Sequence, residues 1–167
     1  MNELLPNLTL VEDPVASLRT VPEVLAARAE WHPDRVAFTP LLRVVAPGLP
    51  VTYGALYRRA RRVAADLQAR DAPGTPVVLV FPNTPDFLDV FLGTILAGLV
   101  AVPVAVPRNG RGMERLLSLA GTARAPLAIA SPSMRLRLDR MLGDAEGGHG
   151  LDWVYADELG QTDAPAF

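Results

Sequence analysis

The chain has 167 residues, 16 of them basic and 18 acidic, which gives a formal net charge of -2 at pH 7. This length predicts a single domain whose core needs no disulfide or metal, and the small net charge argues against a nucleic-acid partner. Cysteine and lysine are both absent, which excludes thiol catalysis, cysteine-ligated metals, Schiff-base chemistry and the lysine of a phosphate-binding loop.

The chain is rich in apolar residues. Hydrophobic residues make up 50% of it and charged residues 20%, against about 25% charged in an average soluble domain. Two explanations remain open at this stage. One is a well-buried α/β core, and the other is a surface that packs against further protein.

Residues 90–107 form an uncharged run whose length is near the minimum for a membrane span. Gly93, Gly98, Pro103 and Pro107 interrupt the run, so we expect a helix end followed by a buried strand, and no membrane span. The amino terminus carries acids and an early proline instead of a basic stretch before an apolar one. This pattern predicts no signal peptide, and together with the absence of cysteine it predicts a cytoplasmic protein.

The amino-terminal part is expected to begin irregularly. Residues 1–19 lack sustained periodicity and are interpreted as an irregular lead, and residues 20–167 as a single α/β subdomain. Thr20 and Glu23 have the spacing of a capping box, in which each residue hydrogen-bonds the backbone of the other. This spacing predicts a helix that starts after Thr20 and runs to about Trp31.

The next segment predicts a short strand pair and a long amphipathic helix. Arg35–Phe38 and Leu41–Val45 alternate loosely around a proline, and Pro47-Gly48 is expected to turn the chain. Thr52 is placed to cap a helix that continues to Arg70, with apolar residues at helical spacing on one face. The other face is interpreted as solvated, with phosphate binding as the alternative, and carries Arg58, Arg59, Arg61 and Arg62.

The rest of the chain alternates strands with helices. The expected strands are short apolar runs bounded by turn residues, namely Val77–Phe81, Val100–Val104, Leu127–Ala130 and Leu151–Tyr155. The expected helices are Asp86–Ala97, Met113–Arg124 and Ser133–Leu142. This order predicts the α/β class, an open and mainly parallel sheet with helices on both faces and right-handed crossovers. The first strand is expected at the centre of the sheet, because it is apolar throughout.

Ligands of open parallel sheets bind beyond the carboxyl ends of the strands, where the strand order reverses. Three loops are therefore candidates for a site: 82–85, 103–112 and 131–132. Two of them contain a cap residue followed by proline, Thr84 before Pro85 and Ser131 before Pro132, and each is expected to start a helix. A glycine-rich loop from Gly143 to Gly150 is expected before the last strand, and a polar tail after it.

The loop before the helix at Met113 contains Gly110-Arg111-Gly112. This sequence lacks the third glycine of a dinucleotide-binding fingerprint, and the loop is too long for the tight turn which that fingerprint needs. We interpret it as a flexible loop. Its arginines, Arg108 and Arg111, have the chemistry to meet an anionic ligand or the carboxylates of a partner.

The chain is expected to carry no catalytic, cofactor-binding or metal-ligating residue. The histidines, His32 and His149, stand outside any metal-ligand or catalytic spacing. Asp86 and Asp89 lie at an expected helix start, where acids complement the helix dipole. The remaining candidates are serines that fit capping better than nucleophilic catalysis, namely Ser131 and Ser133.

One series of motifs resembles a known family. The helix start Val51-Thr52-Tyr53-Gly54-Ala55-Leu56 precedes VVLVFPNTPDFLDVFLGTILAGLVAVPVAVP, which runs from Val77 to Pro107. In order, the series gives a Thr-Tyr-x-x-Leu helix start, a hydrophobic strand, a Pro-Asn turn, an aromatic-bearing helix and an Ala-Gly-x-x-x-Val-Pro strand at Ala97–Pro103. It resembles the amino-terminal part of adenylate-forming enzymes, the group of acyl-CoA synthetases, peptide-synthetase adenylation domains and luciferases.

Within that group, Pro103–Leu116 is most similar to fatty acyl-AMP ligases, which load long acyl chains onto polyketide or peptide synthases. The resemblance spans about Thr20 to Tyr155. This sequence departs from the family pattern at Thr75, where a Gly-Asp pair is common, and at the single Pro107, where a proline doublet is frequent. Both departures weaken the subfamily assignment more than the family assignment.

The resemblance implies that residues 20–167 are an incomplete part of a larger adenylation domain. The family's phosphate-binding loop, its adenine and ribose motifs and its carboxyl-terminal lysine would lie beyond Phe167, so this segment alone is expected to be inactive. The complete enzyme would use ATP and Mg²⁺ to convert a fatty acid to an acyl-adenylate and pass the acyl group to an acyl carrier protein. The implied partners are thus the remainder of the adenylation domain, the fatty acid and the carrier protein.

Two alternatives to this reading remain open. One is a fragment of an acyl-CoA synthetase. The other is a self-sufficient, non-catalytic α/β interaction module, for which either arginine cluster, Arg58–Arg62 or Arg108–Arg111, would be the partner surface.

Overall fold

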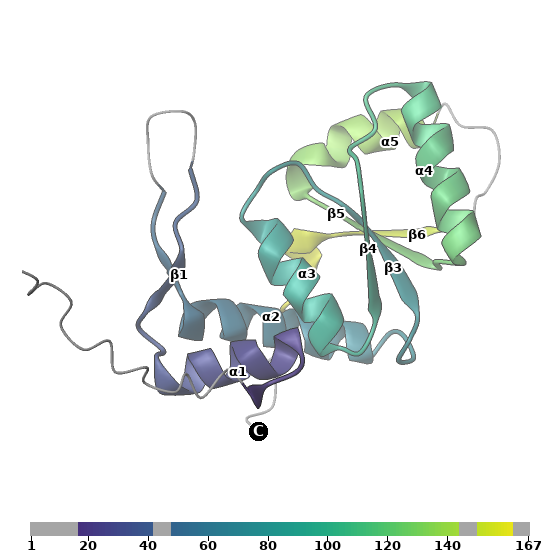
Figure 1. Ribbon diagram of the computed structural model, residues 1–167. Helices are drawn as coiled ribbons and strands as arrows, with labels where there is room; N and C mark the ends of the chain where they lie inside the picture. Colours follow the sequence, from purple (N-terminus) through teal and green to yellow (C-terminus); the bar gives the residue numbers. More distant parts are fainter. Residues whose placement is uncertain (1–16, 42–47, 144–149, 162–167) are drawn as a thin grey trace, which may run out of the picture.

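The computed structural model describes residues 17–41, 48–143 and 150–161. Its helices and strands alternate as the sequence predicts (Figure 1). In chain order they are α1 (Val21–Trp31), β1 (Val36–Phe38), β2 (Val51–Thr52), α2 (Tyr53–Gln68), β3 (Pro76–Val80), α3 (Asp86–Leu96), β4 (Val100–Val104), α4 (Gly110–Ala123), β5 (Leu127–Ala130), α5 (Arg135–Gly143) and β6 (Asp152–Tyr155). Two short 3-10 helices, η2 (Pro132–Met134) and η3 (Ala156–Glu158), follow β5 and β6, so the expected polar tail begins with a turn of helix.

Four strands form a parallel sheet in the order β4-β3-β5-β6. Val78 of β3 lies opposite Val102 of β4 on one side and Ala128 of β5 on the other. The chain therefore adds β4 on one side of β3 and then crosses back to add β5 on the other. The predicted open parallel sheet is confirmed, and its order reverses between β3 and β5.

Helices cover both faces of the sheet because successive side chains of a strand point to opposite faces. Val77 and Leu79 of β3 pack with α2 and α3, whereas Val78 and Val80 pack with α4 and α5. None of these four side chains is more than 1% exposed. The uninterrupted apolar run therefore belongs to a central strand covered on both faces, as predicted.

Three of the predicted helix ends are confirmed. The backbone N–H of Glu23 donates to Thr20 Oγ1 at 3.3 Å, and that of Thr20 donates to Glu23 Oε2 at 3.0 Å, which completes the capping box of α1. The N–H of Ala55 donates to Thr52 Oγ1 at 3.3 Å at the start of α2. Gly98 follows α3 with a φ of 77°, a left-handed conformation that glycine adopts without a steric penalty.

Two predicted caps are wrong in their chemistry. Thr84 donates its hydroxyl to the carbonyl of Pro82 at 3.3 Å, and α3 follows Pro85 without a side-chain cap. The first free N–H groups of α3 donate to backbone carbonyls of Thr84 and Pro85, so the hydroxyl is not needed there. Ser131 also makes no cap, because its hydroxyl is paired with that of Ser133 at 3.0 Å.

Helix α4 begins at Gly110, not at Met113 as predicted. The side chain of Asn109 accepts a hydrogen bond from the N–H of Gly112 at 3.0 Å and caps the helix. Gly110-Arg111-Gly112 is therefore the first turn of a helix and not a flexible loop. The cap satisfies an N–H that the helix itself leaves free, which offsets the poor helix propensity of two glycines.

Strand β4 is an edge strand, although its apolar sequence predicts burial. Val100 is 50% exposed and Pro103 is also exposed. The strand order leaves β4 with a neighbour on one side only within the described part of the chain. An edge strand tolerates a proline such as Pro103, because the missing N–H costs no ladder hydrogen bond on the open side. None of the described helices is long and apolar enough to cross a membrane.

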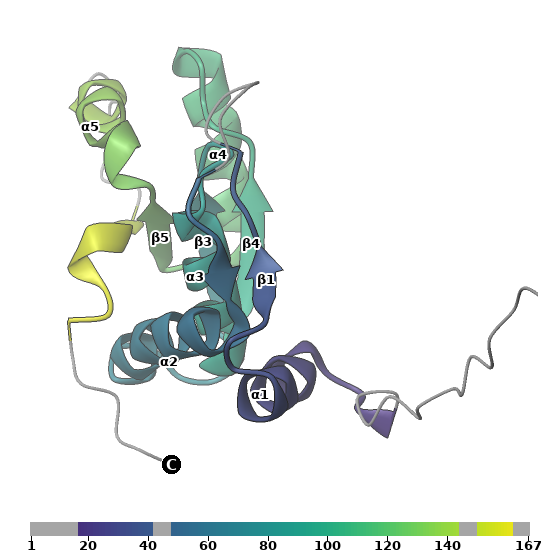
Figure 2. The ribbon, with the colours of Figure 1, turned by 90° about the vertical axis from the view of Figure 1, so that its left-hand side faces the viewer.

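A two-stranded unit precedes the main sheet. β1 pairs with β2 in antiparallel fashion, with Val36 opposite Thr52. Residues 42–47 lie outside the described part, and with them nearly all of the predicted strand Leu41–Val45 and half of the predicted turn. The same holds for most of the predicted lead, for residues 144–149 of the glycine-rich loop and for the last residues of the tail. Helix α1 lies beside α2 at the same end of the molecule (Figures 1 and 2).

Candidate functional site

Two of the three candidate loops flank the point where the strand order reverses. Loop 82–85 follows β3, and residues 131–132 follow β5. The N–H of Ser131 donates to the carbonyl of Val80 at 3.2 Å, which joins the ends of the two strands, and Ser131 is only 2% exposed. The third loop follows the edge strand β4. All three candidate loops therefore lie at the carboxyl edge of the sheet, as the sequence predicts.

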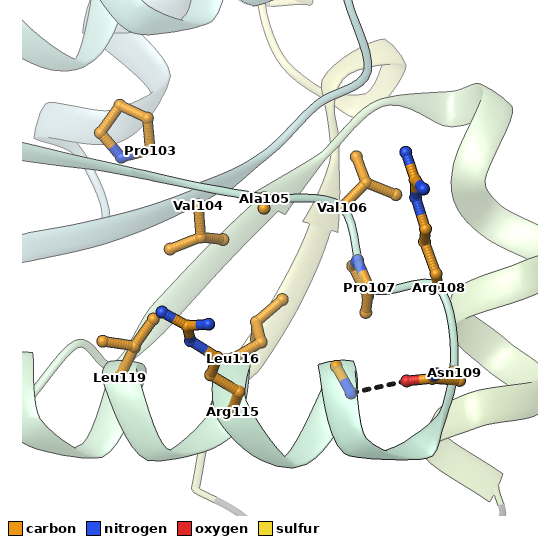
Figure 3. A pocket seen from close by; sticks show the side chains of 11 residues that line it. Pro103, Val104, Ala105, Val106, Pro107, Arg108, Asn109, Arg115, Leu116 and Leu119 are labelled. Atoms are coloured by element: carbon orange, nitrogen blue, oxygen red, sulfur yellow. Dashed lines mark hydrogen bonds between the residues drawn. The ribbon is translucent and has the colours of Figure 1, made fainter.

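A groove of about 630 Å³ lies between the end of β4, the loop after it and the first turns of α4. We call it the β4–α4 groove, and Figure 3 shows its side chains. Arg108 stands at one end beside Val106, and Arg115 lies at the other end beside Leu119 (Figure 3). The full lining comprises Pro103, Val104, Ala105, Val106, Pro107, Arg108, Asn109, Gly112, Arg115, Leu116 and Leu119.

The arginines of this groove differ from the predicted pair. Arg108 lines it as expected, but Arg111 does not, and Arg115 takes its place. Both lining arginines are exposed and neither has an ion-pair partner within the described ranges. Arg115 was missed because the sequence does not show which side of the helix faces the loop after β4. The groove combines an apolar wall with two cations, a combination suited to an anion with an apolar body.

A second pocket, of about 720 Å³, lies on the α3 side of the sheet, whereas the β4–α4 groove lies on the α4 side. One wall belongs to the arm, which we define as residues 36–41 and 48–52, and the other to the loop after β3 and the first turn of α3. We call it the arm pocket. Its lining residues are Phe38, Pro40, Leu41, Asn83, Thr84, Pro85, Phe87 and Leu88. The sequence signalled the 82–85 loop but gave no indication that the arm packs beside it.

The arginine face of α2 is only partly a solvated surface. Arg59 lies 3.8 Å from the carboxylate of Asp89, and the guanidinium of Arg61 lies 5.8 Å from the ring centre of Tyr57. The first contact joins α2 to α3, whereas the second lies within α2, because Tyr57 and Arg61 are one turn apart on that helix. The solvated interpretation holds for Arg58, Arg59 and Arg62, which are exposed, whereas Arg61 is half-buried.

Asp89 is the most strongly perturbed acid of the described chain. Burial raises the pKa of its carboxyl to about 6, and the nearby charge of Arg59 opposes that rise. Its Oδ1 atom is buried without a hydrogen-bond partner, and the carboxyl lies between α2 and α3, away from both pockets. A raised pKa at such a position reflects packing between helices, and it does not mark a general acid.

The other chemically interesting groups form a structural network at the end of the sheet. Arg135 pairs with Asp157 at 2.9 Å and with Glu158 at 2.8 Å, and its guanidinium stacks 3.9 Å from the ring centre of Tyr155. Tyr155 donates its hydroxyl to Asp139 at 2.8 Å. Burial and this hydrogen bond raise the pKa of Tyr155 to about 12, so the phenol stays protonated and joins β6 to α5.

The remaining sequence candidates do not gather into a reactive site. His32 ends α1, where its N–H donates to the carbonyl of Arg28, and His149 lies outside the described residues. Asp86 and Asp89 stand in the first turn of α3, as expected. Residues 17–41, 48–143 and 150–161 contain no group of three or more His, Asp or Glu side chains placed to hold a metal ion.

The described residues do not fit the phosphates of ATP. No lysine occurs in the sequence, and the one glycine-rich stretch placed before a helix, Gly110–Gly112, is the first turn of α4, capped by Asn109. None of the described residues is therefore assigned to ATP or to a magnesium ion.

Comparison with known proteins agrees with the architecture. Residues 25–141 match the family described as AMP-binding enzyme. Because this match covers most of the chain, the chain belongs to that family. The fold resembles the crystal structure of the fatty acid AMP ligase from Legionella pneumophila, with a TM-score of 0.74 at 20% identity over 89% of this chain and 25% of that one.

Among curated relatives, the long-chain-fatty-acid–AMP ligase FadD23 of Mycobacterium tuberculosis (strain CDC 1551 / Oshkosh) is 31% identical over 128 residues, which cover 75% of this chain and 21% of the relative. FadD28 of the same species (strain ATCC 25618 / H37Rv), also a long-chain-fatty-acid–AMP ligase, is 33% identical over 120 residues, which cover 70% and 20%. The chain thus spans about a fifth of the length of these relatives.

Proposed function

We propose that the chain is the amino-terminal part of a fatty acyl-AMP ligase, residues 20–167 being an incomplete subdomain of its adenylation domain. The observation that carries this proposal is the agreement among relatives: FadD23 and FadD28, which match most of this chain, are both long-chain-fatty-acid–AMP ligases. The complete enzyme would activate a fatty acid with ATP to an acyl-adenylate. It would then pass the acyl group to the phosphopantetheine of a carrier protein, in the cytoplasm.

In this proposal ATP and Mg²⁺ belong to the complete enzyme, and this segment provides structure. The buried sheet centred on β3 supplies a rigid support for the loops at its carboxyl edge. The partners of the segment are the remainder of the adenylation domain, the fatty acid and the carrier protein. The exposed apolar residues of β4 and of the arm, among them Val100 and Leu41, favour such covering protein.

The test uses the chain joined to the remainder of its ligase. Supplied with ATP, Mg²⁺, coenzyme A and a long-chain fatty acid, the joined protein is expected to accumulate acyl-adenylate and to form little acyl-CoA, measured by chromatography of the radiolabelled acid. The chain alone is the control. It is expected to give no ATP–pyrophosphate exchange, because it offers no phosphate-binding loop or lysine to stabilise the developing charge.

The three possible failures of this test have different meanings. Efficient acyl-CoA formation by the joined protein would assign it to the acyl-CoA synthetases and leave the family unchanged. Exchange above background by the chain alone would contradict the proposal that catalysis requires the remainder. Absence of adenylate with every fatty acid tried would reject the fatty acyl-AMP ligase itself.

A further inference from the structure

The open edge of β4 has backbone groups available for pairing. The N–H of Val100 donates to the carbonyl of Thr75, directly before β3, at 3.0 Å. Successive residues of a strand turn their backbone groups to alternate sides, so those of Ala101, Pro103 and Ala105 point away from β3. On that side β4 has no neighbouring strand within the described residues. Because proline has no N–H, the free donors of this edge are the N–H groups of Ala101 and Ala105.

The position of Pro103 indicates that this edge stays open. A proline is excluded from strands that are paired on both sides, since its missing N–H would break a ladder hydrogen bond. On an exposed edge, proline instead hinders indiscriminate pairing with other strands. Pro103 is exposed and points its backbone to the open side. The edge is therefore protected against a full added ladder, while the donors on either side of Pro103 remain accessible to a short extended segment.

The β4–α4 groove lies beside this edge and has room for side chains of an added strand. Val104 on β4 and Leu116 and Leu119 on α4 form apolar parts of its lining, and the groove has a volume of about 630 Å³. Leu119 is 43% exposed. Every second side chain of a strand paired with β4 would point to the α4 side of the sheet. The groove therefore suits a segment with apolar side chains at alternate positions.

Arg108 and Arg115 determine the charge that the groove attracts. They stand at its two ends (Figure 3), both exposed and without an ion-pair partner within the described ranges. Two copies of this chain paired edge to edge would bring their arginines together, and this repulsion disfavours a second copy as the occupant. Carboxylates on either side of an apolar stretch would instead meet both cations.

We infer that the open edge of β4 and the β4–α4 groove bind an extended acidic segment of a separate partner protein by strand addition. The backbone of that segment pairs with Ala101 and Ala105, its apolar side chains enter the groove, and its carboxylates reach Arg108 and Arg115. This inference goes beyond the proposed function and does not rest on it, because it concerns binding and assigns no catalytic group.

A synthetic peptide tests the inference on the chain joined to the remainder of its protein. The probe is fluorescein-labelled Glu-Glu-Val-Thr-Val-Thr-Val-Glu-Glu with an amidated carboxyl terminus, and its binding is measured by fluorescence anisotropy. The peptide is expected to bind, and added salt is expected to weaken the binding. The same peptide with glutamine in place of each glutamate is expected to bind about tenfold less tightly, because it loses the attraction to the two arginines.

Helix α4 supplies a matched pair of variants. Arg115→Glu is expected to weaken binding of the acidic peptide by about tenfold, because an attraction becomes a repulsion. Arg111 is also exposed on α4 but does not line the groove. Arg111→Glu, which changes the net charge by the same amount, is expected to change the affinity less than about twofold. Circular dichroism of both variants shows whether the fold is kept.

N-methylation of the peptide separates strand pairing from charge attraction without changing the protein. One peptide carries N-methyl groups on its valines and the other on its threonines. An added strand pairs with its neighbour through every second residue only. One of the two methylated peptides is therefore expected to lose binding, whereas the other keeps it.

Each contrary outcome overturns the inference. Absence of binding at millimolar peptide would show that the remainder of the protein covers the edge or that the edge accepts no strand. Equal losses for Arg115→Glu and Arg111→Glu would show a general attraction between charges instead of a site at the groove. Equal binding of the two methylated peptides would show that no strand is added to β4.

Discussion

At the residue scale, the least favourable charge of the described chain is Asp89. Its Oδ2 atom lies 3.8 Å from Arg59, too far for a strong ion pair, and its Oδ1 atom is buried without a partner. Burial raises the pKa of the carboxyl from 3.8 to about 6, against the opposing charge of Arg59. The folded chain therefore holds this proton more tightly than the unfolded chain does.

This pKa predicts a pH-dependent difference between the chain and its Asp89→Asn variant. Between pH 3.8 and about 6 the folded state binds more protons at Asp89 than the unfolded state, so this group lowers the free energy of unfolding as the pH rises. Asp89→Asn has no carboxyl at this position, so its free energy of unfolding does not fall for this reason. Its melting temperature relative to the parent is expected to increase from pH 4 to pH 6 and then to stay constant. Parallel curves for the two proteins would show that the pKa of Asp89 is not raised.

A second residue-scale prediction concerns the contact of α2 with α3. A Cβ atom at Gly93 would lie 2.6 Å from Val63 Cβ and 2.9 Å from the carbonyl oxygen of Ala60, closer than real side chains approach. Val63 is buried at 6% exposure, and the close atoms include its Cβ and a backbone oxygen, which cannot turn away as the end of a flexible side chain can. Gly93→Ala is therefore expected to lower the free energy of unfolding by about 1–3 kcal/mol, measured in urea.

The matched control is Gly121→Ala in α4. Nothing lies within 4 Å of a Cβ at Gly121. The same substitution should there raise stability by up to about 1 kcal/mol, since alanine has the better helix propensity. Equal effects at the two positions would contradict the close packing of α2 and α3.

At the element scale, the caps decide where helices start. Asn109 accepts a hydrogen bond from the backbone of α4, whereas Thr84 makes no such bond to α3. Asn109→Ala is therefore expected to cost about 0.5–2 kcal/mol of stability in urea unfolding, and Asn109→Asp to keep most of it. Thr84→Ala, the cap expected from sequence, should cost less than Asn109→Ala. A larger loss of stability for Thr84→Ala than for Asn109→Ala would show that Thr84 does cap α3.

The same two positions show how far local sequence patterns determine the elements. The patterns at Thr20, Thr52 and Gly98 were interpreted correctly, because a cap depends on a few neighbouring residues. At Asn109 the two glycines that follow are poor helix formers and concealed a side-chain cap. At Thr84 the sequence predicted a side-chain cap, but the first N–H groups of α3 donate to the backbone carbonyls of Thr84 and Pro85 instead.

At the scale of the whole molecule, the strand order separates what the sequence could predict from what it could not. The alternation of strands and helices predicted the parallel sheet, the buried centre at β3 and the edge that carries the loops. The exposure of β4 was missed, because an apolar run does not reveal whether one neighbour or two will cover it. The arm pocket was missed as well, since it joins Leu41 to Asn83 through packing between distant segments.

The exposed apolar side chains help to explain why the chain is rich in apolar residues. A buried core explains much of its apolar content, but large apolar residues also remain on several surfaces, including Leu41, Leu49, Val100 and Leu136, which are 80%, 86%, 50% and 74% exposed. The buried core therefore accounts for part of the apolar content, and the second explanation, a surface that packs against further protein, stays a proposal. Such exposed residues are common where further protein packs.

The last prediction follows from these surfaces. The folded chain is expected to bind a hydrophobic dye and to self-associate as its concentration rises, monitored by dye fluorescence and analytical ultracentrifugation. Leu136→Glu should lower the dye signal without lowering the melting temperature, because the side chain is 74% exposed. Arg137→Glu, at the exposed neighbouring position, changes charge but removes little apolar surface and should leave the signal nearly unchanged. A chain that stays monomeric and dye-silent at high concentration would favour a self-sufficient module over a subdomain covered by further protein.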